Sequence, residues 1–446
     1  MYLLSIDIGS TWTKGALFSM ENGVMKLVSR DAIPTTQENL SEGVFEIKSR
    51  LTSKTPDMVR FSSSAKGGLG ISVIGLVQDL SLYAGKLAAW SSGGKLISVH
   101  ANGLTQSGMN EILSKHPDII LITGGTDGGH EEKIIRAATT VQESRFPGTV
   151  VYAGNSHIQE IISKIFKNRV VVTENIMPSL GSFQGEKASD IIRKVFLSEI
   201  VEGKGLGKVR EILGCDPVPT PVSMMNLVDS ITRFNENWGF FGAVDLGGAT
   251  TDVYSSSTED YTSGIVFRGL PEPLIKRTVE GDLGMRVSSK NTIENMDQNP
   301  ETDNTGIQNW VKQISQDFSK ISQSKEEKYM DRELARICIR NSMLRHCGEI
   351  EKVWTTEGEI SVQKGRNLKK LKKLVLTGGY LSQFSDFSIY SSSFPGLPLI
   401  VDSKEKLIPQ SPDIYFDDKY LWPLIGNFAE DFPEAAAAFA VESLSG

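Results

Sequence analysis

The stretch Asp245-Leu246-Gly247-Gly248-Ala249-Thr250-Thr251-Asp252, with its shorter counterpart Asp7-Ile8-Gly9-Ser10-Thr11, decides the fold of this chain. Each stretch follows a short apolar run, opens on an aspartate, turns on glycine and ends in hydroxyl residues. A second apolar run follows each turn, at 15–18 and 253–255, so each stretch predicts a strand–turn–strand hairpin. Glycine lets backbone N–H groups approach phosphate oxygens, and hydroxyls add donors. The pair predicts two hairpins that grip one polyanion from opposite sides.

A third stretch, Leu374-Val375-Leu376-Thr377-Gly378-Gly379-Tyr380, is an apolar strand that breaks into a double glycine. One such turn carries little weight, because tight turns use glycine widely. Three in this order, with acidic residues in the first two only, resemble the phosphate-1, phosphate-2 and adenosine motifs of the superfamily that contains actin, Hsp70 chaperones and sugar kinases. The resemblance implies an α/β fold with two ribonuclease H-like ATPase lobes. The alternative interpretation is three ordinary hairpins with turn aspartates.

The composition is that of an ordinary soluble globular protein. The chain has 446 residues, 39% of them hydrophobic and 23% charged, which suggests about two to four domains. A net charge of −7 argues against broad attraction to nucleic acid or to an anionic membrane. The start has no basic leader before an apolar core, and no apolar run approaches membrane-spanning length. We expect a cytoplasmic protein with no nucleic-acid or membrane partner.

The domain boundaries follow from the pattern of apolar runs. We expect residues 1–56 to start the N-terminal ATPase lobe, and residues 57–200 to hold an inserted α/β domain and the rest of that lobe. Residues 201–223 are expected to form a connector, and residues 224–446 to form the C-terminal lobe. Strand-like runs alternate with helix-like segments in the inserted region, which predicts a doubly wound parallel sheet. The strands are expected at 71–77, 96–100, 119–123, 150–153 and 170–173, and the helices at 79–90, 104–116, 130–143 and 157–166.

The two hairpins carry the residues expected to bind phosphates. Phosphoryl transfer depends on positioning and charge stabilisation more than on covalent chemistry by the protein. The turn amides and hydroxyls of one lobe and of the other can each hold phosphate oxygens, from Gly9, Ser10 and Thr11 and from Gly247, Gly248 and Thr250.

Asp7 and Asp245 should face the same phosphates, and that arrangement implies Mg²⁺ between them. Asp245 is the candidate that positions or deprotonates the attacking water, with Asp7 as its partner. Asp252 is a second candidate for the metal shell, because alternation along a strand could return it towards the site. Lys14 could reach a phosphate, but we interpret it as a surface lysine.

The third hairpin should complete the nucleotide site. Gly378, Gly379 and Tyr380 are expected to line an adenosine pocket. Glu280-Gly281-Asp282-Leu283-Gly284 resembles the glycine–acid segment that starts a nucleotide-facing helix in Hsp70-like proteins. Glu280 is therefore a candidate nucleotide contact, although acidic residues also favour any helix N-terminus. The predicted cofactors are ATP and Mg²⁺.

Six segments, two of which include stretches quoted above, make the resemblance more specific. Together they are similar to the glutamate mutase (methylaspartate mutase) accessory family known as MutL or GlmL, which is unrelated to the mismatch-repair protein of the same name. They span Asp7 to about Phe439, and residues 290–305 and 364–366 depart most. The resemblance implies an ATP-dependent reactivating chaperone that remodels an adenosylcobalamin-dependent mutase or aminomutase. The segments are 63–68, 117–129, 174–178, 245–252, 279–286 and 433–438.

The inserted region also resembles the cobalamin-binding domain of such mutases. That class of domain binds cobalt through a histidine in an Asp-x-His-x-x-Gly loop after its first strand. Here the place reads Asp79-Leu80-Ser81-Leu82-Tyr83-Ala84-Gly85, with Ser81 where the histidine would be. A hydroxyl is a poor cobalt ligand, so the domain could imitate the mutase subunit without ligating cobalamin. A generic doubly wound domain is the alternative.

Three rival functions remain open. A small-molecule kinase of the same fold could use Asp7 or Asp245 on an acceptor. A nucleotide-dependent scaffold would bind ATP with negligible turnover. An iron–sulfur activator of dehydratases would need cysteines, but of Cys215, Cys338 and Cys347 the last two are nine residues apart on a helix expected at 326–353. That spacing is about 900° of helix, so the two thiols should point to opposite faces.

Overall fold

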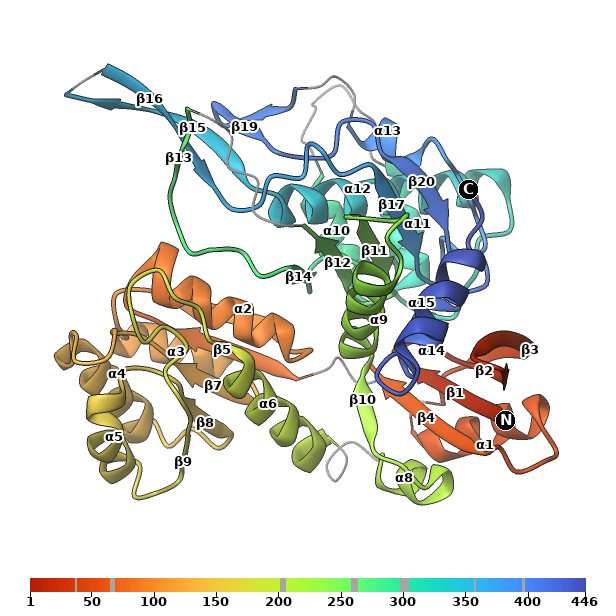
Figure 1. The fold of residues 1–446 in the computed structure, drawn as a ribbon, viewed down its shortest axis with the longest axis horizontal. Coiled ribbons are helices and arrows are strands. Elements are labelled where there is room, and N and C mark those ends of the chain that lie inside the picture. The colour runs from red at the N-terminus through yellow and green to blue at the C-terminus, as the bar shows by residue number, and fades with distance from the viewer. Residues whose placement is uncertain are drawn as a thin grey trace.

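The computed structural model describes residues 1–36, 38–64, 69–200, 206–257, 264–296, 305–356, 358–394 and 398–446. Those residues form four five-stranded sheets. Two of the sheets belong to matching lobes, one to an inserted domain, and the fourth extends the second lobe as a β-hairpin that projects from the molecule (Figure 1).

The first lobe is a mixed sheet that begins with the Asp7 hairpin. Strand β1 pairs antiparallel with β2 and parallel with β4, and the strand order is β10-β4-β1-β2-β3. Six of the seven residues of β1 are buried, because helix α1 covers one face and helices from the far end of the chain cover the other. The elements are β1 (Tyr2–Ile8), β2 (Trp12–Glu21), β3 (Val24–Pro34), α1 (Leu40–Leu51), β4 (Met58–Ser63) and β10 (Pro217–Pro219).

The second lobe repeats that sheet strand for strand. Its order is β14-β12-β11-β17-β20, and the first sheet read from its other edge is β3-β2-β1-β4-β10. Each strand of the first lobe therefore has a counterpart at the same place and in the same chain order. This duplication confirms the two-lobed, ribonuclease H-like fold expected from the hairpins. The strands are β11 (Gly242–Leu246), β12 (Thr251–Ser256), β14 (Ile275–Glu280), β17 (Lys373–Thr377) and β20 (Asp413–Phe416).

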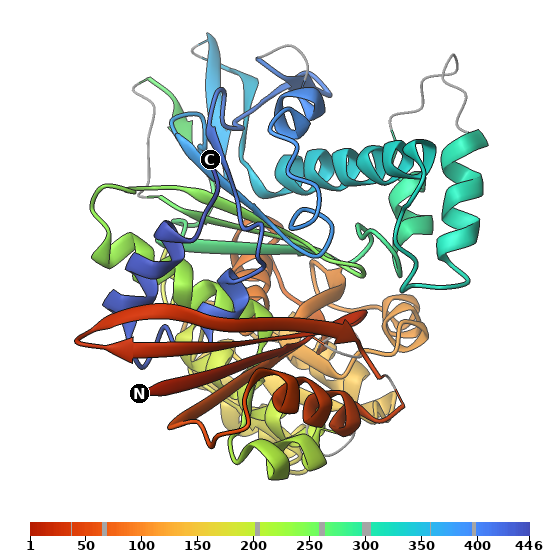
Figure 2. The same cartoon turned by 90° about the vertical axis from the view of Figure 1, so that its right-hand side faces the viewer.

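Helices exchanged between the lobes join the two sheets. Helix α9 (Thr220–Phe234) leaves β10 and packs against β12, whereas α14 (Trp422–Gly426) and α15 (Pro433–Glu442) follow β20 and pack against β1 and β3. Phe18 of the first lobe meets the rings of Phe428 and Phe439 edge to face, at centroid distances of 6.3 and 5.9 Å. Figure 2 shows these C-terminal helices, in blue, between the two sheets. The lobes therefore share a core at their junction.

The long helix of the second lobe is shorter than the sequence suggested. Helix α12 (Lys325–His346) begins at a capping box in which Ser324 and Glu327 satisfy each other's backbone amides. It ends before Cys347, because Gly348 breaks it and the chain continues as strand β15 rather than as helix to Val353. Cys338 and Cys347 are both buried in the core of this lobe.

The other elements of the second lobe surround α12. In the segment that departs most from the family resemblance, a helix covers 289–294, and 297–304 lie outside the described residues. The elements are β13 (Val266–Phe267), α10 (Ser289–Glu294), α11 (Thr305–Ile314), β15 (Glu349–Thr355), β16 (Gly358–Lys364), α13 (Ile389–Ser393), β18 (Ile400–Val401) and β19 (Lys404–Lys406).

The inserted domain is a parallel sheet with helices on both faces. Its order, β6-β5-β7-β8-β9, is the flavodoxin-like order 2-1-3-4-5 of doubly wound sheets. All five expected strands and all four expected helices are present. The elements are β5 (Gly70–Ile74), a π-helical turn (Gln78–Leu82), α2 (Tyr83–Ser91), β6 (Lys95–His100), α3 (Gln106–Ser114), β7 (Ile119–Ile122), α4 (Glu132–Glu143), β8 (Thr149–Tyr152), α5 (Gln159–Ile165), β9 (Val170–Val172) and α6 (Glu186–Val195).

The loop after β5 is stabilised by hydrogen bonds to the side chain of Ser81. The hydroxyl of Ser81 accepts hydrogen bonds from the amides of Leu76 and Val77, both at 3.1 Å, and the residue is 1% exposed. The side chain at the place of the cobalt-binding histidine is thus used to hold the backbone turn.

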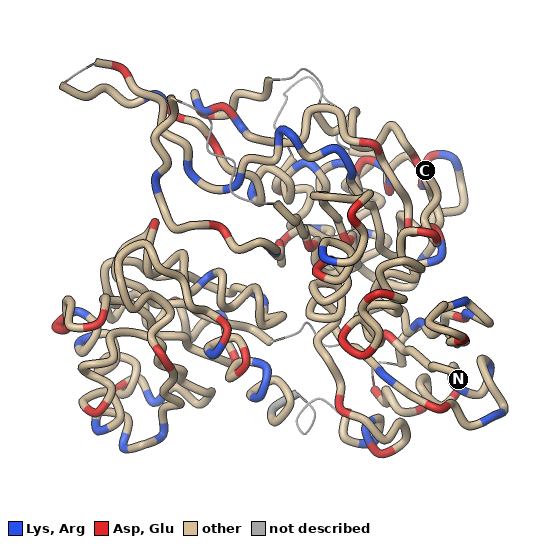
Figure 3. Tube along the Cα trace, viewed as in Figure 1, with Lys and Arg blue, Asp and Glu red and all other residues tan. Residues whose placement is uncertain are grey.

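The chain returns from the inserted domain through the segment predicted to be a connector. Within its described part, α8 (Gly207–Leu213) packs against α1, and β10 adds an edge strand to the first sheet. The inserted domain itself lies against the second lobe, where Leu87 and Trp90 of α2 pack on Val279 of β14. Acidic and basic residues are interspersed along the trace in all three domains (Figure 3).

Candidate functional site

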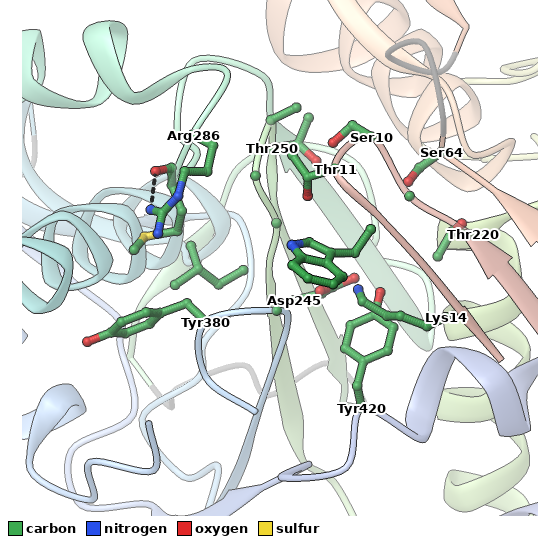
Figure 4. A pocket seen from close by; sticks show the side chains of 18 of the residues that line it. Ser10, Thr11, Lys14, Ser64, Thr220, Asp245, Thr250, Arg286, Tyr380 and Tyr420 are labelled. Atoms are coloured by element: carbon green, nitrogen blue, oxygen red, sulfur yellow. Dashed lines mark hydrogen bonds between the residues drawn. The ribbon is translucent and has the colours of Figure 1, made fainter. Parts of the chain in front are cut away.

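A cavity of about 310 Å³ lies between the two lobes and is lined by both glycine hairpins. Figure 4 shows Ser10, Thr11 and Thr250 at its hairpin tips, Lys14 and Tyr420 at one end, and Arg286 and Tyr380 at the other. The cavity therefore runs from the paired hairpins to the region predicted to bind adenosine.

The two hairpins have the same backbone geometry. The amide of Gly9 donates to the carbonyl of Trp12 at 3.0 Å, and the amide of Gly247 donates to the carbonyl of Thr250 at 2.9 Å. A Cβ at either glycine would lie 2.8 to 2.9 Å from that carbonyl oxygen, so the turn excludes a side chain there. The tips nearly meet across the cavity, since a Cβ at Gly248 would lie 3.0 Å from Cγ2 of Thr11.

Asp245 is the carboxylate that reaches the cavity from the second hairpin. Burial, together with the neighbouring charge of Asp252, raises its pKa to about 7, although the charge of Lys14 acts to lower it. A carboxyl group that titrates near neutrality can gain and lose a proton at the pH of a cell.

Asp7 is the equivalent residue of the first hairpin, but it lies behind the cavity wall. Its Oδ1 accepts hydrogen bonds from the hydroxyls of Ser62 (3.0 Å) and Thr220 (2.6 Å), and its Oδ2 accepts one from Tyr420 (3.1 Å). It is 1% exposed and is not among the lining residues, whereas Thr220 and Tyr420 are. Asp7 thus positions two residues of the cavity wall.

Lys14 is a cavity residue and not the surface lysine that the sequence suggested. Its Nζ lies 3.3 Å from the centre of the Tyr420 ring. Burial lowers its pKa, while the charges of Asp7 and Asp245 raise it. Lys14 is directly opposite Asp7 in the β1–β2 ladder, as Asp252 is opposite Asp245 in the β11–β12 ladder.

Asp252 lines the cavity, but its carboxylate forms an ion pair with the buried guanidinium group of Arg277. Nε and Nη2 of Arg277 donate to its Oδ1 at 2.8 and 2.5 Å, and the hydroxyl of Thr250 donates to its Oδ2 at 3.0 Å. Arg277 also donates to backbone carbonyls of the inserted domain. The hydroxyl–carboxylate–guanidinium chain connects the turn of the second hairpin to the neighbouring domain.

Two predicted contacts, Glu280 and Gly378, do not line the cavity. Glu280 pairs with Arg345 at 2.7 Å, and burial raises its pKa. Gly378 has φ +120°, and a Cβ there would overlap the carbonyl oxygen of Leu246. Gly378 therefore has a structural role, because the lack of a side chain lets the turn after β17 pack against the end of β11.

The far end of the cavity has the aromatic and basic residues that suit a nucleoside. Gly379 and Tyr380 line it as predicted, and the Tyr380 ring lies 5.2 Å from that of Phe384 at 31°. Arg286 is held over this end by Asp331 at 2.9 Å. Its backbone amide donates to the carbonyl of Gly248, so the second hairpin and this end of the cavity are one rigid unit.

Asp418 adds a second carboxylate to the cavity wall. Its Oδ1 is buried and has no hydrogen-bond partner among the described residues. A buried, unpaired carboxylate oxygen is costly unless a cation approaches it. Mg²⁺ is usually bound by one or two carboxylates together with phosphates and water, and Asp245 and Asp418 fit that requirement. No cluster of three or more His, Cys, Asp or Glu side chains that could hold a metal occurs in the described part of the chain.

Sequence reasoning missed several lining residues. Asp418 stands in the pair Asp417-Asp418 directly after β20, and Thr220 stands directly after β10, which is the matching strand. Alignment of the two halves could have found both. Lys95 and Arg277 have no local motif, because tertiary packing brings them to the cavity. The basic run 364–373 does not line the cavity; its Arg366 is buried and donates to backbone carbonyls such as that of Ser255.

Among the helices that the structure describes, none combines the length and apolar character needed to cross a bilayer.

Among solved structures, a glycerol dehydratase reactivase is 10% identical, with 97% of this chain and 100% of that chain covered and a TM-score of 0.36. A ROK family protein from Streptococcus pneumoniae is 12% identical, with 97% and 99% covered and a TM-score of 0.29. A Ppx/GppA family member from Aquifex aeolicus is 11% identical, with 89% and 72% covered and a TM-score of 0.24.

Sequence comparison covers almost the whole chain. Protein MutL of Clostridium tetanomorphum is 34% identical over an alignment of 458 positions, which covers 98% of this chain and 97% of that protein. The family described as MutL protein matches residues 3–444. The chain belongs to the MutL protein family.

Proposed function

We propose that the protein binds Mg-ATP between its two lobes, hydrolyses it slowly, and uses the cycle to remodel an adenosylcobalamin-dependent mutase. The observation that carries the nucleotide part is the pair of matching hairpins on one cavity. Their tips, at Thr11 and Gly248, lie almost in contact. Two sets of turn amides and hydroxyls on one enclosed space are suited to a polyphosphate.

In this proposal each lobe contributes half of the phosphate site. The hydroxyls of Ser10, Thr11 and Thr250 and the turn amides at Gly9, Gly247 and Gly248 hold phosphate oxygens. Asp245, in its ionised form, orients the attacking water and accepts its proton. Lys14 supplies positive charge at the same end, where the Tyr420 ring supports its ammonium group.

Asp245 and Asp418 are the carboxylates that would hold Mg²⁺, partly through water, and Asp252 and Asp7 would act on it from further away. The ion supplies charge neutralisation between phosphate oxygens. Gly379 and Tyr380, together with Arg286, hold the nucleoside. Gly378 supports that turn, and Glu280 acts on the site only through the segment that it anchors.

The partner in this proposal is a cobalamin-dependent mutase or aminomutase of the glutamate mutase type, in the cytoplasm. Membership of the MutL family supports it, since the family resemblance implies a mutase accessory role. The doubly wound inserted domain is the proposed contact, because it has its own sheet and one hydrophobic cluster that is formed by its residues alone.

Calorimetry tests the nucleotide part. We expect ATP to bind with higher affinity in the presence of Mg²⁺ than in EDTA, and ³²P-labelled γ-phosphate to be released as inorganic phosphate. Absence of Mg²⁺-dependent binding would refute the proposal. Transfer of the label to an added small molecule would favour the kinase, and binding without release would favour the scaffold.

A co-purification assay tests the partner. The tagged protein is mixed with a purified glutamate mutase, with a non-hydrolysable ATP analogue, with ADP or with no nucleotide. We expect the amount of mutase retained to depend on the nucleotide. Equal retention in all three samples would argue against a remodelling cycle, and no retention in any would argue against this partner.

A further inference from the structure

The inserted domain reaches the nucleotide cavity through the short loop between α2 and β6. Gly93 of this loop and Lys95, the first residue of β6, line the cavity, although they belong to neither ATPase lobe. Gly93, at φ +87°, packs against the β10–α9 junction of the first lobe, where a Cβ on it would lie 2.7 Å from Cβ of Pro219. The loop thus forms part of the cavity wall beside the β10–α9 junction.

The second lobe holds this loop from the opposite side through Arg277. Nη1 of Arg277 donates to the carbonyl of Trp90 at 2.7 Å and to that of Gly94 at 3.3 Å. The remaining donors of the same guanidinium bind Asp252, on the strand that follows the phosphate hairpin. Arg277 is only 3% exposed, so solvent does not screen these interactions.

Lys95 makes the reverse contact, because here a side chain of the inserted domain donates to a backbone carbonyl of the second lobe. Its Nζ donates to the carbonyl of Gly281 at 3.3 Å, a long bond to an oxygen that also accepts from the hydroxyl of Ser288 at 3.0 Å. Gly281 has no side chain to interfere, and a Cβ there would overlap Cε of Lys95. The glycine of the Glu280-Gly281-Asp282 segment therefore makes room for a lysine of the inserted domain.

A phosphate would be a stronger acceptor for this lysine than the carbonyl it now contacts. Hydrogen bonds between ammonium and phosphate are charge-assisted and about twice as strong as neutral ones. Asp252 and Asp282 act on Lys95 electrostatically and favour its charged form, while burial disfavours it. An additional negative charge in the cavity would oppose that effect of burial.

We propose that Lys95 contacts the terminal phosphate of the bound nucleotide, and that Arg277 positions its loop, so that the inserted domain senses whether the cavity holds a triphosphate or a diphosphate. The inference rests on the proposed nucleotide site and assigns to it a residue from the third domain. It also gives the nucleotide a route to the proposed mutase-binding domain, without any change in the far parts of either lobe.

The test compares ATP-analogue and ADP affinities of the full chain by calorimetry, for Lys95→Gln, Lys95→Arg and Gly281→Ala. We expect the preference for triphosphate to fall roughly tenfold or more in Lys95→Gln, with ADP binding unchanged, and to be largely restored in Lys95→Arg. Gly281→Ala should resemble Lys95→Gln, because its methyl group displaces the lysine while the charge remains. Gly281 is not among the residues with positive φ, so alanine fits its backbone.

Lys86→Gln is the matched control, because it removes a lysine of the same domain, from the preceding helix α2, that does not line the cavity. Its nucleotide preference should equal that of the wild type. Hydrogen exchange supplies the second readout. The analogue should protect residues 91–95 in the wild type and Lys86→Gln but not in Lys95→Gln, while protection of the hairpin at 245–250 stays in all three.

The outcomes separate this inference from the proposed function. A wild-type preference for triphosphate in both Lys95→Gln and Gly281→Ala would overturn the sensing role and leave the nucleotide site intact. Failure of the wild type to bind any nucleotide would overturn both. If Lys95→Gln fails to fold in a melting experiment, Gly281→Ala decides alone, because it retains every charged residue.

Discussion

Asp7 and Asp245 occupy the same position in two matching hairpins, but only Asp245 reaches the cavity. Three hydroxyls cover the carboxylate of Asp7, whereas Asp245 lines the cavity and has a pKa raised to about 7. Their ladder partners differ as well, since Lys14 faces Asp7 and Asp252 faces Asp245. The duplicated sheets thus supply opposite charges to the two sides of one site, and the chemistry is expected to depend on the second lobe.

Asp245→Asn should abolish most hydrolysis and leave nucleotide binding measurable. The amide keeps the shape of the side chain but cannot accept a proton from water. We expect the rate of phosphate release to fall at least about tenfold, which is roughly 1.4 kcal/mol of barrier. Asp7→Asn is the comparison, and we expect a smaller direct effect on the rate because its carboxylate acts through Thr220 and Tyr420. Equal losses in the two variants would contradict the assignment of the base.

The pH dependence of hydrolysis should report the Asp245 carboxyl group. Below its pKa of about 7 the group is protonated and cannot accept a proton, so the rate should rise with pH through that region and level off above it. Added Mg²⁺ favours the ionised form and should move the midpoint to lower pH. The measurement is the steady-state rate from pH 5.5 to 9 at several Mg²⁺ concentrations, and a flat profile would exclude this base.

The same pKa has a consequence for stability without nucleotide. In the unfolded chain an aspartate titrates near about 3.9, so between about pH 4 and 7 the unfolded state loses a proton that the folded state keeps. Folding stability contributed by this group therefore falls as pH rises through that window. At pH 8 in EDTA, Asp245→Asn should melt at a higher temperature than the wild type, and a lower melting temperature would count against the raised pKa.

Asp252→Asn should destabilise the protein even when nucleotide and metal are absent. It leaves the guanidinium of Arg277 buried without a counter-charge, and breaking a buried ion pair in this way costs about 3–5 kcal/mol. Urea unfolding in EDTA measures the loss. Glu111→Gln, which removes one side of an exposed i,i+4 pair with Lys115, is the control and should change stability by less than about 1 kcal/mol. If Asp252→Asn changed only the affinity for Mg²⁺, its role would be that of a metal ligand.

Nucleotide should hold the two lobes together. The tips at Thr11 and Gly248 are already close enough to share one phosphate group, so the described arrangement is a closed one. Without a polyanion the hydroxyls and amides of both turns have no common acceptor, and hinge opening becomes favourable. Small-angle scattering should give a smaller radius of gyration with a non-hydrolysable ATP analogue than without ligand. Identical curves would contradict a clamp.

Local sequence patterns were sufficient for the repeated parts of the fold and for the hairpins. Glycine turns between apolar strands specify their own geometry, so the contacts of Gly9, Gly247 and Tyr380 with the cavity could be predicted. The positions of Asp7 and Glu280 could not, because their partners Thr220, Tyr420 and Arg345 are far away in sequence. The helix end at His346 was missed for the same kind of reason, since residues 349–355 became a strand by pairing with β16.

Ser81 gives the last prediction, because its hydroxyl holds a turn at the place where a cobalt ligand was considered. Ser81→Ala would leave the amides of Leu76 and Val77 without their acceptor, which should cost about 1–3 kcal/mol of unfolding free energy. The same use of the hydroxyl leaves the wild type without a cobalt ligand there. We therefore expect hydroxocobalamin mixed with the wild-type protein to keep the absorption spectrum of the free cofactor. A spectrum of histidine-ligated cobalamin would contradict the idea that this domain imitates a cobalamin domain without binding the cofactor, and unchanged stability of Ser81→Ala would contradict the structural role of the hydroxyl.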